Sequence, residues 1–160
     1  MEREMSTRLL KKHLQYKIPQ IRLALSREPD TEPIPIQTPE DVEHFLEPLK
    51  HYSEEYFVSL HLDARHRVIG YHVVSHGTLS SSLVHPREVF KAALLANSHS
   101  IIVAHNHPTG ACSPSDEDIT TTQQLISAGA MLGVSILDHI IVTINGVYSL
   151  REQMQHLWKN

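Results

Sequence analysis

The chain has 160 residues, of which 41% are hydrophobic and 20% charged, and its formal net charge is −4. These values are typical of one globular domain with a substantial core, and the acidic balance argues against a broad nucleic-acid-binding face. The only cysteine, Cys112, excludes a disulfide framework or a cysteine-rich zinc ribbon. Neither a signal peptide nor an apolar stretch long enough to span a bilayer occurs, so a cytoplasmic protein without a membrane partner is expected.

The first part of the chain predicts few regular elements. Residues 1–16 read as a short helical lead-in, and the alternation in 18–28 predicts a half-buried strand. Four prolines at 29–39 indicate an extended connector. A helix over 40–50 follows, with Thr38 as its N-cap. We expect 1–30 to be a lead-in with a first strand, and 31–160 to be one globular unit.

The middle of the chain predicts a hairpin, a helix and a buried strand. Two aromatic and β-branched runs, 55–63 and 67–75, are joined by "ARH" and form the hairpin. The helix covers 85–98, with His85 at its entry before a proline. The wholly apolar run at 100–105 is typical of a central strand that is covered on both faces.

The last part of the chain adds a helix and a second hairpin. The helix starts at Ser115 and ends near Gly129 or Gly133, and Asn145-Gly146 is a strong two-residue hairpin signal. The tail, 151–158, reads as one or two helical turns. Because strands and helices interleave while hairpins are also present, we expect a mixed sheet with helices on both faces, an α/β or α+β fold.

Chemically active side chains are concentrated in "AHNHPTGACSPSDED" at 104–118. His105 and His107 lie two residues apart at the end of a strand, so both imidazoles point to one side. Asp118 falls in the first turn of the next helix, within reach of the same point. Zn²⁺ accepts these three ligand types, and a fourth position left for water is typical of a catalytic site. The spacing therefore favours one zinc ion per chain.

A zinc hydrolase also needs a general base and a group that stabilises the oxyanion. Ser115 carries a hydroxyl beside the backbone N–H groups of a helix start, where an anion is favoured. Glu54 and Glu55 head the strand at 55–63. They are the candidates for the base if that strand lies beside 100–105.

The same residues also have a purely structural interpretation. Ser115 and Asp118 fit a capping box, and a histidine pair at a strand end often binds no metal. The combination favours a metal, because a helix cap does not require two histidines facing one way. Cys112 is either a further ligand or an ordinary loop thiol. Asp138 and His139, inside an apolar strand, are either core residues or partners behind the ligands.

The order H-x-H-P, six residues, then S-x-x-D at 105–118 resembles the signature of the JAMM (MPN+) metalloenzymes. The stretches "SLVHPREVFKAALLANSHSIIVAHNHPTG", "ILDHIIV" and "YSLRE" resemble the RadC-type branch of bacterial JAB/MPN domains, over about residues 18–152. The resemblance implies a curved, mixed sheet flanked by helices and zinc held by His105, His107, Asp118 and water. It also implies Ser115 as an oxyanion partner and a catalytic glutamate, for which the pattern E-x-F-x-x-L-x-L-D fits Glu55 better than Glu54.

The chain departs from the longer RadC proteins in two places. Residues 1–30 are too short for their helix-hairpin-helix segment and lack its glycine turns, so we expect a short, stand-alone JAB domain. Acidic residues precede a Gly-Thr pair in the longer type, whereas this chain has "YHVVSHGT" there. The second strand of the hairpin therefore offers no base, which leaves Glu55.

Three functional hypotheses follow from these residues. The first is a JAMM-type zinc metallopeptidase or isopeptidase acting on a peptide or protein. The second, suggested by the association of RadC with repair, is a DNA repair accessory protein, which the acidic charge disfavours. The third is a metal-binding interaction module without turnover, which would need the ligands but not Glu55. The sequence does not indicate an oligomeric state.

Overall fold

The computed structural model describes residues 32–77 and 84–159, with positions 12, 24 and 26. Most of the expected lead-in at 1–16 and of the expected strand at 18–28 lies outside the described residues. Of the expected connector, Ile34 and Pro35 form a short strand at the edge of the sheet.

The described ranges form one six-stranded sheet in the order β1-β3-β2-β4-β5-β6. Its strands are β1 (Ile34–Pro35), β2 (Glu55–Leu62), β3 (Arg67–Gly77), β4 (Ser100–Asn106), β5 (Ser135–Thr143) and β6 (Gly146–Ser149). Neighbouring strands pair antiparallel except β4 and β5, which are parallel. The two expected hairpins are β2–β3 and β5–β6, so the prediction of a mixed sheet is confirmed.

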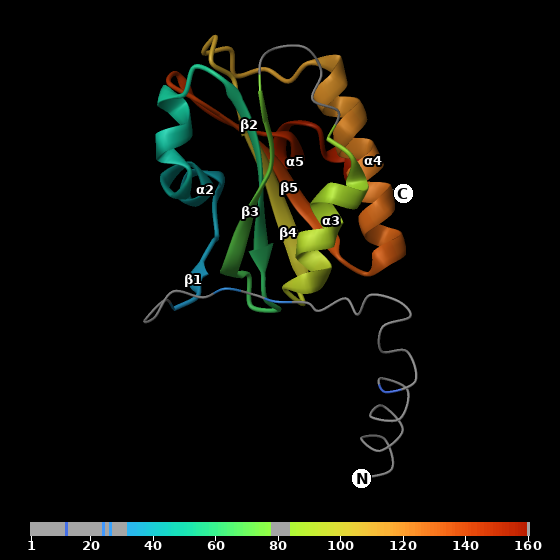
Figure 1. The fold of residues 1–160 in the computed structure, drawn as a ribbon. Coiled ribbons are helices and arrows are strands. Elements are labelled where there is room, and N and C mark those ends of the chain that lie inside the picture. The colour runs from blue at the N-terminus through green and yellow to red at the C-terminus, as the bar shows by residue number, and fades with distance from the viewer. Residues whose placement is uncertain (1–11, 13–23, 25, 27–31, 78–83, 160) are drawn as a thin grey trace.

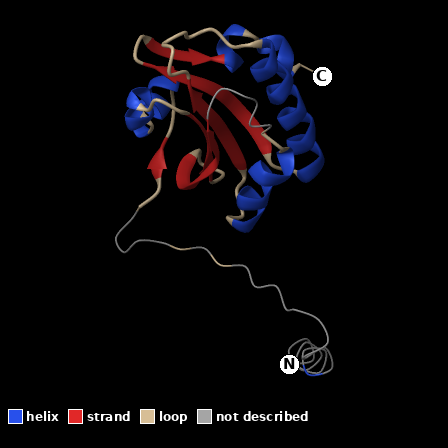
Figure 2. Ribbon diagram, turned by 45° about the horizontal axis from the view of Figure 1, so that its top comes forward, coloured by secondary structure: helices blue, strands red, loops and turns tan. Residues whose placement is uncertain are grey.

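Helices cover both faces of this sheet. Figures 1 and 2 show α2 on one side and α3 with α4 on the other. The helical segments are α2 (Pro39–Phe45), η1 (Glu47–His51), α3 (Pro86–Leu95), α4 (Asp116–Leu132), α5 (Leu150–Gln153) and η2 (Gln155–Trp158). The expected α+β architecture is therefore confirmed. Among the described helices, none combines the length and apolarity needed to cross a membrane.

Two expected helices differ from the observed ones. The helix expected at 40–50 ends after Phe45 and continues as the short η1. Pro48 explains the break, because its ring carries no N–H and clashes with a preceding carbonyl in an α-helix. The helix expected at 85–98 ends at Leu95, and Asn97 takes a left-handed conformation (φ 52°) just beyond it. His85 is its N-cap, as expected for a helix-entry residue.

Strand β4 is the centre of the core, and all of its residues are buried. On one face, Ile102 and Ala104 pack with residues of α2, η1 and β2, such as Val42 and Leu49. On the other face the core is formed with α3 and α4. The prediction that the apolar run at 100–105 is a central strand covered on both faces is therefore confirmed.

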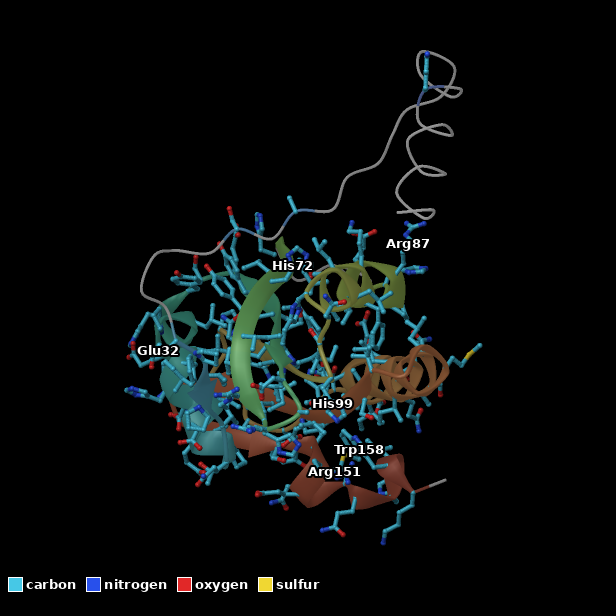
Figure 3. All side chains as sticks on the ribbon, turned by 90° about the horizontal axis from the view of Figure 1, so that it is seen from below. Glu32, His72, Arg87, His99, Arg151 and Trp158 are labelled. Atoms are coloured by element: carbon cyan, nitrogen blue, oxygen red, sulfur yellow. The ribbon has the colours of Figure 1, made fainter. Side chains whose placement is uncertain are left out.

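The C-terminal segment packs on the end of the sheet. The indole N–H of Trp158 donates to the carbonyl of Ile136 in β5 at 2.8 Å. The guanidinium of Arg151 lies 5.2 Å from the centre of the Trp158 ring, and Figure 3 labels both side chains together on this segment. A cation against an indole face stabilises such a contact, and this holds the tail on β5.

Candidate metal centre

The candidate ligands come from the junction between β4 and α4. Strand β4 ends at Asn106. The alternation of side chains along it turns His105 and His107 to the same side, as expected. His105 is completely buried, whereas 15% of the His107 side chain is exposed. Pro108 follows at once and cannot donate to a strand ladder, so the chain turns away from the sheet here.

The first turn of α4 supplies the third group. Ser115 is the N-cap, and its hydroxyl accepts from the backbone N–H of Asp118 at 3.1 Å. In return, Oδ2 of Asp118 accepts from the backbone N–H and the hydroxyl of Ser115, both at 2.7 Å. The expected capping box is thus present. It fixes the carboxylate while leaving Oδ1 directed at His105.

The three groups meet at one point. Nε2 of His105 lies 2.9 Å from Nε2 of His107 and 3.2 Å from Oδ1 of Asp118. Nε2 of His107 lies 3.5 Å from Oδ2 of Asp118. Among the described residues, these three form the group that could hold a metal ion, with ligand atoms all within 4.8 Å of one another. The structural and the metal interpretations of Ser115 and Asp118 are therefore compatible.

The donor set fits a small divalent cation. Tetrahedral zinc bonds of roughly 2.0–2.2 Å set neighbouring ligand atoms about 3.4 Å apart, close to the separations seen here. Nδ1 of His107 lies 2.7 Å from the carbonyl of Ala111. Because a carbonyl only accepts, Nδ1 carries the hydrogen, and in its neutral form the ring directs the lone pair of Nε2 at the group. Two facing imidazole nitrogens beside a carboxylate require a proton or a metal ion between them.

Electrostatics reflect this crowding of acceptors. The hydrogen bond to Asp118 raises the pKa of His107, and burial opposes this in part. Burial alone would raise the pKa of Asp118, but the two imidazoles of His105 and His107 that face its carboxylate hold this pKa far below its ordinary value. Asp118 is therefore an anion at neutral pH, as a metal ligand must be.

Of the expected partners behind the ligands, His139 contacts the group and Asp138 does not. Nε2 of His139 lies 2.8 Å from Nδ1 of His105, and both rings are fully buried. The carboxylate of Asp138 instead accepts from Ser149 at 2.6 Å and from the backbone of Arg151 at 3.0 Å. Burial raises the pKa of Asp138 and lowers that of His139 well below its ordinary value.

A cleft of about 530 Å³ opens over the group and contains the expected base. Glu55 lines it together with His107, Ser115 and Asp118. Antiparallel pairing sets Phe57 of β2 opposite His105 of β4, so Glu55 lies two residues further along, level with His107. The expectation that β2 adjoins β4 is therefore confirmed.

The neighbouring Glu54 lies outside the residues that line the cleft. Its side chain is exposed, and its carboxylate lies 3.8 Å from Nδ1 of His76. Its carbonyl accepts from the side-chain amide of Asn106 at 3.0 Å, while the amide oxygen of Asn106 accepts from the backbone of Tyr56 at 2.7 Å. Asn106 thus fixes the start of β2, and with it Glu55, against the end of β4.

The loop between β4 and α4 is tied to the β5–β6 hairpin. The side-chain amide of Asn145 donates to the carbonyl of Gly110 at 2.9 Å. Gly110 has φ +81°, and a side chain there would meet Asn145 at 2.8 Å, so glycine is required. Sγ of Cys112 lies 3.2 Å from the hydroxyl of Thr143. Among the described residues, Cys112 does not belong to the group that could hold a metal ion.

Two residues of this site were missed by sequence reasoning, Asn106 and Thr122. Asn106 stands between the two candidate ligand histidines, where a buried polar side chain inside an apolar strand needs partners. Thr122 lies one helical turn after Asp118, on the same face of α4. The i, i+4 spacing from a candidate ligand is the signal that would have identified it.

Comparison with known proteins agrees with this geometry. The six-stranded mixed sheet and the His-His-Asp group define a JAB-type domain with a candidate metal centre. Residues 36–156 match the family described as "RadC-like JAB domain", and the chain belongs to that family. The sequence resemblance to RadC-type JAB/MPN domains is therefore confirmed.

The curated relatives carry names that specify no activity. A UPF0758 protein of Alkaliphilus metalliredigens is 46% identical over 119 residues, which cover 74% of this chain and 51% of that protein. A UPF0758 protein of Methanosarcina mazei is 44% identical over 119 residues (74% and 52%). One of Staphylococcus carnosus is 48% identical over 110 residues (68% and 49%). The chain thus spans about half the length of these relatives.

Proposed function

We propose that this chain is a zinc-dependent hydrolase of the JAMM type that cleaves an amide bond in a peptide or protein. The observation that carries the proposal is the convergence of His105, His107 and Asp118 at a cleft that Glu55 and Ser115 also line. Membership of the RadC-like JAB domain family supports it.

The proposed zinc ligands are His105, His107 and Asp118, with one ion per chain. Zinc bound by these residues would act as a Lewis acid and lower the pKa of water to about 7. Asp118 supplies the negative charge that offsets part of the charge of the ion. The two bonds from Ser115 hold that carboxylate in place without any cation.

Glu55 is the proposed general base. A carboxylate level with His107 at the edge of the cleft can take a proton from attacking water and later deliver it to the leaving amine. Its backbone is fixed by strand β2 and by the bonds of Asn106 to the residues on either side of it. This restricts the positions that the carboxylate can reach.

Ser115 is the proposed partner of the oxyanion. In the structure its hydroxyl donates to Asp118. To stabilise a tetrahedral oxyanion, the hydroxyl therefore exchanges this acceptor for the substrate oxygen. The position at the start of α4 favours negative charge there, because unpaired backbone N–H groups and the helix dipole point the same way.

Metal analysis tests the centre itself. Purified protein is expected to contain about one zinc per chain, and His107→Ala or Asp118→Ala is expected to remove it. Retention of zinc by both variants would refute the assignment of the ligands.

Activity measurements test the base. Screening against unbiased peptide libraries identifies a cleavable sequence, and Glu55→Gln is expected to abolish its hydrolysis while keeping the metal. Glu54→Gln is the matched control, because it removes an adjacent carboxylate that does not line the cleft. Full activity in Glu55→Gln would show that the base is another group. Zinc without turnover on any peptide would favour the non-catalytic metal-binding module.

A further inference from the structure

A chain of buried hydrogen bonds continues from His105 away from the cleft. Nδ1 of His105 lies 2.8 Å from Nε2 of His139, and Nδ1 of His139 lies 2.6 Å from the hydroxyl oxygen of Thr122. That hydroxyl donates to the backbone carbonyl of Asp118 at 2.6 Å. His105, His139 and Thr122 have no exposed surface. This series of hydrogen bonds thus starts at the candidate ligand His105 and ends on the backbone of the candidate ligand Asp118.

Counting hydrogens along this chain fixes the state of each ring. Thr122 has one hydroxyl hydrogen, and the carbonyl of Asp118 takes it, so the oxygen of Thr122 must accept from Nδ1–H of His139. The His139 ring is fully buried, and its two nitrogens face His105 and Thr122 rather than a carboxylate, an environment that disfavours a charged ring. Its Nε2 therefore carries a lone pair, which accepts from Nδ1–H of His105. The lone pair of His105 is left on Nε2.

We propose that His139 and Thr122 are positioning residues that hold His105 in the Nδ1–H tautomer, with Nε2 free to bind a metal ion. This inference rests on the metal centre proposed above. Histidine ligands usually donate their second N–H to a carboxylate, a carbonyl or water. A carboxylate or a carbonyl can only accept a hydrogen bond, and water can reorient to accept one. An imidazole can donate or accept, so His139 needs a second group, Thr122, to define its own tautomer.

Phe57 strengthens the arrangement. Its ring lies parallel to that of His105, at 5.9 Å and 10°, and edge-on to that of His139, at 5.4 Å and 65°. These contacts hold both imidazole planes, so that each nitrogen keeps its partner. Because His139 belongs to β5 and Thr122 to α4, these hydrogen bonds also connect His105 on β4 to the helix that carries Asp118.

The first test measures zinc affinity in competition with a chromophoric chelator. Thr122→Val keeps the side-chain shape and removes the hydroxyl, and we expect it to weaken zinc binding by about 10- to 100-fold. Thr122→Ser retains the hydroxyl and is expected to bind zinc like the unaltered protein. Thr120→Val is the matched control, since Thr120 donates to the carbonyl of Asp116 at 2.9 Å in the same i, i−4 pattern but is exposed. Equal zinc affinity in Thr122→Val and Thr120→Val would overturn the inference.

The second test reads the tautomers directly. Long-range ¹H–¹⁵N spectra of the metal-free, ¹⁵N-histidine-labelled full chain are expected to show the hydrogen of His139 on Nδ1, and a mixture of tautomers in Thr122→Val. A His139 ring protonated on Nε2 in the unaltered protein would overturn the inference even if the metal centre stands. If the unaltered protein bound no zinc, the proposed function would fail, whereas these spectra would still decide the tautomer.

Discussion

Asp118 caps α4 and is a proposed metal ligand, and the substitution Asp118→Asn tests both roles. In Asp118→Asn the oxygen that accepts from Ser115 remains, but the charge at the start of α4 and the anionic ligand are lost. Without metal, we expect the free energy of unfolding to fall by about 1–2 kcal/mol, because the cap is weakened and a charge–dipole interaction is lost. For a chain of this size the Tm would fall by roughly 2–8 °C.

Zinc changes the comparison. At a free zinc concentration of about 100 times Kd, the unaltered protein gains roughly 2.7 kcal/mol of stability. A variant that binds a hundredfold more weakly gains only about 0.4 kcal/mol at the same concentration. The assay is denaturant unfolding followed by circular dichroism, with zinc and with a chelator. For each variant it gives the free energy of unfolding that the substitution removes without metal, and the free energy that zinc adds.

Two variants complete this experiment. Ser115→Ala is expected to lose about 1 kcal/mol through the cap and to keep the zinc-dependent gain, because the ligand charge is intact. Asp116→Asn removes an exposed charge from the same turn without touching the ligands, so it controls for the helix dipole. The reasoning is refuted if Asp118→Asn keeps the full zinc-dependent gain, or if Asp116→Asn loses it.

Further predictions concern the rest of the fold. Burial lowers the pKa of His61 to about 4, whereas the unfolded chain takes up this proton near 6.5, so stability is present above pH 6.5 and declines as the pH falls towards 4. His61→Gln should therefore reduce the loss of unfolding free energy between pH 7 and 5 by about 2 kcal/mol, and an unchanged pH dependence would contradict the assignment. Gly129→Ala should destabilise by about 1–3 kcal/mol, because the added carbon would lie 2.4 Å from the carbonyl of Val134. Gly70→Ala meets no atom within 4 Å and serves as the control in the same thermal unfolding assay.

Local signals predicted the parts of the fold that local physics determines. The Asn145-Gly146 turn, the capping box at Ser115 and the apolar run of β4 each specify an element through a few neighbouring residues. Boundaries were predicted less well, because a single backbone feature decides them. Pro48 divides one helix and the left-handed Asn97 ends another early.

In the candidate site, too, features set by neighbouring residues were predicted, whereas features that depend on packing were not. The spacing of His105 and His107 sets their common direction, whereas the direction of Asp138 and His139 was not predictable. Pairing of β4 with β5 slips by one residue between Ile101 and Ile102, so Ile102 lies opposite Asp138. Such a bulge interrupts the alternation from which facing side chains are inferred. The partnership of Thr122 with His139 likewise depends on how α4 packs against β5, and no local pattern encodes it.

The three candidate ligands lie between positions 105 and 118, on one strand end, one loop and one helical turn. Short loops close at little entropic cost, so this segment can bring its ligands together early in folding. Glu55 is brought to the site only when β2 pairs with β4, and His139 only when β5 pairs with β4. We expect a chain arrested before those pairings to bind a metal ion at the candidate ligands while lacking the rest of the cleft. Metal content would then report only that this local segment has formed, whereas turnover would report the complete site of the proposed hydrolase.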